Sequence, residues 1–141
     1  MEKIVYAREL SLSVDDYIRV VGDSTLGPGR PLSDRPRLEA MLTGANFFVT
    51  ARLDGECIGL ARGLTDFAWV CYLGDVAVRN GYQGKGVGRS IMLKCKEELG
   101  DGVAIALLSM PEAKPFYDSL ESVMNLKRNA NAYYMQRERG V

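Results

Sequence analysis

The sequence lacks histidine altogether, although it has 141 residues. Without an imidazole there can be no Ser-His-Asp triad, no Cys-His pair and no histidine metal ligand. Any proton transfer must therefore use a carboxylate, a tyrosine, a cysteine, a lysine, the backbone or water. Cysteine is scarce too: three residues, far apart and without a C-x-x-C pair, predict reduced thiols in the cytoplasm and neither a disulfide nor a zinc site.

Long hydrophobic runs and an excess of charge are also missing. No stretch of about 18 apolar residues is present, which predicts that the chain does not span a membrane. Residues 1–8 carry charges where a signal peptide needs an apolar stretch. Eighteen basic residues balance eighteen acidic ones, whereas proteins that neutralise nucleic-acid phosphates usually have a basic excess. We therefore expect neither a membrane nor a nucleic acid as partner.

What is present is typical of one globular domain. A chain of 141 residues, 47% of them hydrophobic, can bury a substantial core. The Gly- and Pro-rich segment 22–36 is too short to separate two domains and is expected to be a loop. Because no repeat or longer linker divides the sequence, we expect a single domain over residues 1–141.

Hydrophobic periodicity predicts six strands and four helices. The Asp54-Gly55 pair predicts a hairpin turn. Apolar residues at every fourth position predict a helix over residues 87–99, which connects two parallel strands. The order indicates an α/β (α+β) fold, a mixed sheet with helices on both faces. The expected strands are 3–8, 47–53, 57–64, 69–78, 103–108 and 132–136, and the expected helices begin at 13, near 34, at 87 and at 111.

A glycine-rich turn joins a buried strand to the helix 87–99. It contains Gly84, Gly86 and Gly88, which let the backbone approach a ligand closely. The first N–H groups of a helix have no partner in the helix, so they can bind a phosphate with help from the helix dipole. The spacing fits neither the Walker pattern nor the dinucleotide fingerprint.

The pattern that fits is Q-x-x-G-x-G, formed by Gln83, Gly86 and Gly88. Residues 111–117, with the letters PEAKPFY, match a P-x-A-x-x-F-Y segment. With these motifs the sequence resembles the GNAT superfamily of acyl-coenzyme A-dependent N-acetyltransferases over nearly its whole length. The resemblance implies a mixed, mostly antiparallel sheet of six to seven strands with about four helices on both faces. It also implies a homodimer.

The resemblance implies acetyl-coenzyme A as co-substrate and no metal. Backbone groups of Val76 and Val78, on either side of Ala77, would pair with the pantetheine arm as a further strand does. The alternative is an ordinary central strand and a glycine turn that only caps a helix. Ala113 and Phe116 would lie beside the cofactor. The pyrophosphate would lie against the turn and the start of the helix, at Gln83, Gly84, Lys85, Gly86, Val87, Gly88 and Arg89.

By the same resemblance, Tyr117 is the general acid that protonates the leaving sulfur. The alternative is a helix tyrosine that packs on the sheet. A backbone N–H near Val76 would stabilise the developing oxyanion. Where some relatives carry a glutamate base the sequence has Tyr72, which with an ordinary pKa of about 10 is a poor base. The other candidates, acting through water, are Asp75 and Glu56, and each of them can instead be purely structural.

The expected function is transfer of the acetyl group of acetyl-coenzyme A to a primary amine of a small molecule or peptide, by direct attack in a ternary complex. We expect the acceptor to lie near the loop 22–36, the second helix, and Phe47 and Phe48. Where the family usually has a Gly-Phe pair, the sequence has Glu121 and Ser122. These departures, together with Tyr72, leave open a catalytically weak coenzyme A-binding sensor or interaction module. The glycine turn leaves open a nucleotide-binding regulatory domain.

Overall fold

The computed structural model describes residues 3–138, which divide into two compact units at Leu108. The first unit holds the sheet and most of the helices. Its strands are β1 (Ile4–Glu9), β2 (Phe47–Leu53), β3 (Glu56–Thr65), β4 (Val70–Val78) and β5 (Ala104–Leu107). Its helices are α1 (Val14–Gly22), α2 (Arg35–Gly44) and α3 (Val87–Leu99), with the 3-10 turns η1 (Gly27–Gly29) and η2 (Asn80–Tyr82).

The five strands form one sheet in the order β1-β2-β3-β4-β5. The first four are antiparallel neighbours, and β5 runs parallel to β4 because α3 connects the two. The predicted hairpin is confirmed: Asp54 and Gly55 have φ values of 51° and 82°, the left-handed conformations that a tight two-residue turn requires. The expected mixed, mostly antiparallel sheet is therefore present.

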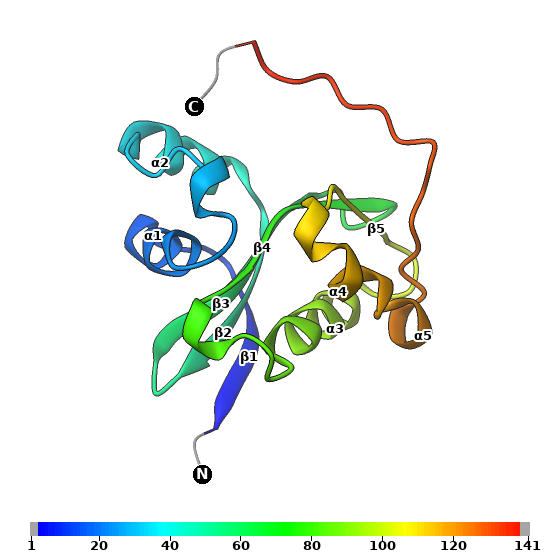
Figure 1. The fold of residues 1–141 in the computed structure, drawn as a ribbon, viewed down its shortest axis with the longest axis horizontal. Helices are drawn as coiled ribbons and strands as arrows, with labels where there is room; N and C mark the ends of the chain where they lie inside the picture. The colour runs from blue at the N-terminus through cyan, green and yellow to red at the C-terminus, as the bar shows by residue number, and fades with distance from the viewer. Residues whose placement is uncertain (1–2, 139–141) are drawn as a thin grey trace. The chain divides into compact units, whose positions relative to one another are not determined.

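Helices cover both faces of this sheet. Figure 1 shows α1 and α2 on one side of the strands and α3 on the other. Ser13 begins α1 by accepting a hydrogen bond from the N–H of Asp16 at 3.0 Å. Facing α3, Gly59 lies so close to the helix that an added Cβ would be 2.8 Å from Cδ1 of Ile91. A side chain at this position would displace Ile91, so the glycine allows α3 to pack closely on β3.

The second unit holds three short helical segments and no strand within its described residues. These are η3 (Pro111–Ala113), α4 (Lys114–Asp118) and α5 (Glu121–Met124), so the helix expected over 111–120 is divided. Arg128, in the segment that follows α5, pairs with Asp118 of α4 at 2.5 Å. Of the described residues, 3–138, none belongs to a helix long and apolar enough to cross a bilayer.

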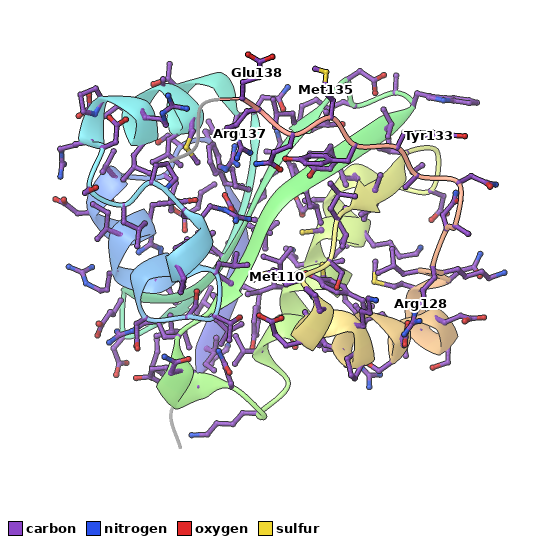
Figure 2. The ribbon with its side chains drawn as sticks, turned by 45° about the horizontal axis from the view of Figure 1, so that its top comes forward. Met110, Arg128, Tyr133, Met135, Arg137 and Glu138 are labelled. Carbon is purple, nitrogen blue, oxygen red and sulfur yellow. The ribbon has the colours of Figure 1, made fainter. Side chains whose placement is uncertain are left out.

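The strand expected over 132–136 is wrong, and the sheet of residues 3–138 has five strands instead of six or seven. The same residues form five α-helices instead of about four. Glu121 and Ser122 continue the helical path as α5, and Asn125 ends it with φ 58°. Residues 125–138 then form no strand and pair with none of the five strands in the sheet. Figure 2 shows the side chains of Tyr133 and Met135 projecting from this extended segment, and both are more than nine-tenths exposed.

Candidate functional site

A β-bulge interrupts β4 at its middle. Arg62 of β3 pairs with Asp75 and the next residue, Gly63, pairs with Leu73, so Gly74 is an extra residue without a partner on β3. An extra residue changes which side chains share a face of the sheet. Asp75 therefore lies on the same face as Tyr72, the face that α1 and α2 cover further along the strand.

Beyond the bulge, β4 separates from β5. The parallel ladder joins Val70–Leu73 of β4 to Ala104–Leu107, and it ends there. For residues 75–78 no strand of the described chain completes the sheet on that side. Their backbone groups can therefore pair with an extended ligand that carries amides, as if it were a further strand. Val76, Ala77 and Val78 are the three predicted cofactor residues in this half of the strand.

The turn after β4 is fixed by polar contacts. The Gln83 side chain donates to the backbone carbonyl of Val78 at 2.9 Å and thereby closes the turn. The N–H of Asn80 donates to the carbonyl of Asp23 at 2.8 Å. Arg79 pairs with carboxylates of Asp23 and Glu56 at 3.2 and 2.7 Å. Gln83 therefore holds the turn in place, whereas the sequence predicts it only as part of a cofactor motif.

The glycines of the turn lead into the N-terminus of α3. Gly84 and Gly86 have φ values of +75° and +83°, a region that side chains other than glycine rarely adopt. Gly86 is the N-cap of α3 and offers no side-chain oxygen to the first N–H groups of the helix, those of Val87 and Gly88. These donors and the helix dipole together favour an anion. Arg89 is exposed, and Nζ of Lys85 lies 5.9 Å from the ring centroid of Tyr82.

Asp75 lies in a buried ion-pair network beside the bulge, on the face of the sheet that α1 covers. Its two carboxylate oxygens accept from Nε of Arg30 and Nε of Arg62, each at 2.5 Å. The hydroxyl of Tyr17 donates to the same carboxylate at 3.0 Å, and Nη2 of Arg30 donates to the carbonyl of Gly74. Burial, followed by the charge of Asp75, raises the pKa of Tyr17 far above its usual range. The carboxylate is thus engaged in holding α1, β3 and the bulge together.

The other candidate bases are placed differently. Glu56 begins β3, six residues or about 20 Å from Arg62 along the strand, so it does not reach the bulge. Tyr72 is half-exposed beside the bulge. Phe47 and Phe48 are fully buried and do not line an open acceptor site, contrary to the expectation from the sequence. Within the described residues, no three His, Cys, Asp or Glu side chains are grouped as metal ligands.

In the second unit, α4 carries the predicted general acid. Tyr117 and Phe116 are both half-buried, and their rings meet edge to face with centroids 4.9 Å apart. Ala113 ends η3, immediately before this helix. The spacing of the F-Y motif therefore places all three predicted residues on two consecutive helical segments.

Arg62 is a residue that the sequence analysis missed. It interrupts a run of otherwise buried β3 residues that begins at Cys57, and such a charge inside a core strand was the available signal. Its partner Asp75 lies thirteen residues later in the sequence, and the other arginine that pairs with Asp75, Arg30, lies forty-five residues before Asp75.

A bulged fourth strand that leaves its parallel neighbour, followed by a glycine turn at a helix N-terminus, defines an acetyltransferase type of fold. The chain matches the model of the Acetyltransferase (GNAT) family over residues 16–120, and it belongs to this family. A comparison with curated proteins finds no match.

Solved structures agree with this assignment. A candidate acetyltransferase from Deinococcus radiodurans R1 shares 29% identity with the chain and superposes with a TM-score of 0.71, covering 95% of this chain and 88% of that one. A Staphylococcus aureus protein of unknown function, also considered an acetyltransferase, has 22% identity and a TM-score of 0.70, covering 96% and 100%. An aminoglycoside N-acetyltransferase in complex with coenzyme A has 14% identity and a TM-score of 0.69, covering 99% and 97%.

Proposed function

We propose that the protein transfers the acetyl group of acetyl-coenzyme A to a primary amine of a small molecule or peptide. The observation that carries this proposal is the free edge of β4 over residues 75–78, which leads directly into the uncapped N-terminus of α3. A strand edge suits the amides of a pantetheine arm, and a helix N-terminus suits a pyrophosphate. The family match and the relative solved with coenzyme A support the same co-substrate.

Each predicted residue has a role in this proposal. The backbone of Val76 and Val78 pairs with the pantetheine arm, and the N–H groups from Gly84 to Arg89 bind the pyrophosphate. Gln83 fixes the turn between these two parts through its bond to the Val78 carbonyl. Ala113 leaves space for the cofactor, and Phe116 packs beside it.

In the reaction, the acceptor amine attacks the thioester carbonyl directly. A backbone N–H near Val76 donates to the carbonyl oxygen. Tyr117 donates a proton to the leaving sulfur. Because Asp75 is paired with two arginines, we propose that it holds the bulge and that water, beside Tyr72, receives the proton of the amine.

The substitution Tyr117→Phe tests this assignment. We expect free-thiol release with a panel of amines to fall about 100-fold or more, the usual effect of removing a general acid, while the affinity for acetyl-coenzyme A is unchanged. Tyr133→Phe, at an almost fully exposed tyrosine, is the matched control. If the wild type binds acetyl-coenzyme A but releases no thiol with any amine, the coenzyme A-binding module is the better description. Thermal stabilisation by ATP or NAD and not by acetyl-coenzyme A would instead indicate the nucleotide-binding domain.

We also propose that both compact units belong to one acetyltransferase domain over residues 1–141. The family match supports this, because residues 16–120 cross the division at Leu108. Sedimentation at several protein concentrations tests the homodimer that the family resemblance implies.

A further inference from the structure

One face of the sheet becomes progressively more open along β3 and β4. The strand register places three pairs in a row on this face: Leu60 with Ala77, Arg62 with Asp75, and Leu64 with Tyr72. The first pair is buried under α1, and the last pair is exposed by 46% and 40%. Arg62 therefore lies at the boundary between the covered and the open part of the face, beside the bulge.

The guanidinium of Arg62 is only partly used by the protein. Its Nε bonds Asp75, and in the part of the chain that the structure describes Nη1 and Nη2 have no acceptor. The head group lies directly against the bulge, since a Cβ added at Gly74 would be 2.7 Å from Nη2 and 3.3 Å from Cζ. By contrast, all three nitrogens of Arg30 donate to acceptors, on Asp75, Gly29 and Gly74.

The network also carries an excess of positive charge. Two arginines share one carboxylate, and the Arg62 side chain is only 12% exposed, so water compensates little of the remaining charge. A partly buried cation is stable when it has a partner, and the free end of a guanidinium matches a carboxylate with two parallel hydrogen bonds. The site is therefore complementary to a ligand that carries a carboxylate.

The floor of the open face is apolar. In register with β4, two small residues of β5 extend the face: Ala104 lies opposite Val70, and Ala106 lies opposite Tyr72. Together with Leu64 these residues are exposed. An acceptor that lies on this floor therefore meets hydrophobic surface under its body and one cationic side chain at the bulge.

We propose that Arg62 binds the carboxylate of the acceptor, so that the substrate is an amino acid or short peptide with an apolar side chain. The inference rests on the proposed acetyl transfer and names the acceptor class for it. Arg62 is a binding and specificity residue in this proposal, and Asp75 and Arg30 position it.

The test compares apolar amino acids with the amines that lack only the carboxylate: phenylalanine with phenethylamine, and leucine with isoamylamine. We expect kcat/KM to favour the amino acid of each pair by about 10- to 100-fold, the effect of one charge-assisted bidentate contact. Arg62→Gln should remove this preference by lowering kcat/KM for the amino acids and not for the amines. Arg62→Lys should keep part of the preference. Arg52→Gln is the matched control, because Arg52 pairs with Glu9 and Asp16 away from the bulge.

Calorimetric titrations of acetyl-coenzyme A and of phenylalanine separate the two proposals. If acetyl-coenzyme A binds and amines are acetylated without a carboxylate preference, the acceptor inference is wrong and the proposed function stands. If phenylalanine binds through Arg62 but no acetyl transfer occurs with any amine, the proposed function is wrong and the carboxylate site stands. If Arg62→Gln weakens the binding of acetyl-coenzyme A, the arginine binds the co-substrate and the inference is overturned.

Discussion

Replacing Asp75 with asparagine removes the charge on which the buried network of the bulge depends. The carboxylate is fully buried and accepts from Arg30, Arg62 and Tyr17. Asparagine has nearly the same shape and can still accept one of these hydrogen bonds. The substitution therefore tests the electrostatic contribution with little change in packing.

The magnitude follows from the two arginines that lose their counter-ion. Removing one partner of a buried ion pair costs about 3–5 kcal/mol. The arginine side chains are 24% and 12% exposed, so water compensates part of this cost. We expect a loss of about 3 kcal/mol, a large share of the roughly 5–15 kcal/mol of a typical domain. For a chain of this length the melting temperature then falls by about 10 °C.

Urea denaturation at pH 7 measures this loss directly. A second variant, with Asp75→Leu, Arg30→Met and Arg62→Met combined, removes all charges at once. It should recover most of the stability, because a buried ion network can be replaced by apolar side chains without a net loss. A loss below about 1 kcal/mol for Asp75→Asn, or a triple variant as unstable as the single one, would refute the electrostatic explanation.

Two further predictions concern the thiols and the glycine turn. Burial raises the pKa of Cys57 and Cys71 to about 11 and that of Cys95 to about 12, from an ordinary value of 9.0. Above pH 9 the unfolded chain releases thiol protons that the folded chain retains, so the free energy of unfolding falls as the pH rises from 9 to about 12. Urea titrations across this range measure the fall. A constant free energy of unfolding would contradict the burial of the thiols. Gly86→Ala places a Cβ at φ +83°, which lowers the free energy of unfolding by about 1–2 kcal/mol. We also expect calorimetry to show weaker binding of acetyl-coenzyme A to this variant. Gly44→Ala, in α2, is the control and should bind normally.

The parts of the fold that the sequence predicts are those with a local cause. Asp54-Gly55 fixes a hairpin by its own backbone preference, and the four-residue repeat of apolar side chains fixes α3 over residues 87–99. The glycine turn is also local, since its residues are consecutive and lie between a strand and a helix. These elements are present where the sequence predicts them.

The parts that could not be predicted depend on partners far away in the sequence. The expected strand over 132–136 has a suitable composition, but a strand forms only by pairing with another strand, and in the structure these residues take part in no ladder. The bulge at Gly74 is a matter of register between two strands, which composition does not reveal. Asp75 is joined to an arginine forty-five residues earlier, so its structural role was hidden by its position near the motif.

The packing of α3 connects ligand binding to the cooperativity of the whole sheet. The helix contacts β1, β2, β3 and β4, and its first turn is also the proposed anion site. A ligand bound there stabilises the folded state by mass action. Because α3 cannot leave its place without exposing four strands, this stabilisation extends to strands that never touch the ligand. Amide hydrogen exchange should therefore slow in β1 and β2, at the far edge of the sheet, as well as in the glycine turn.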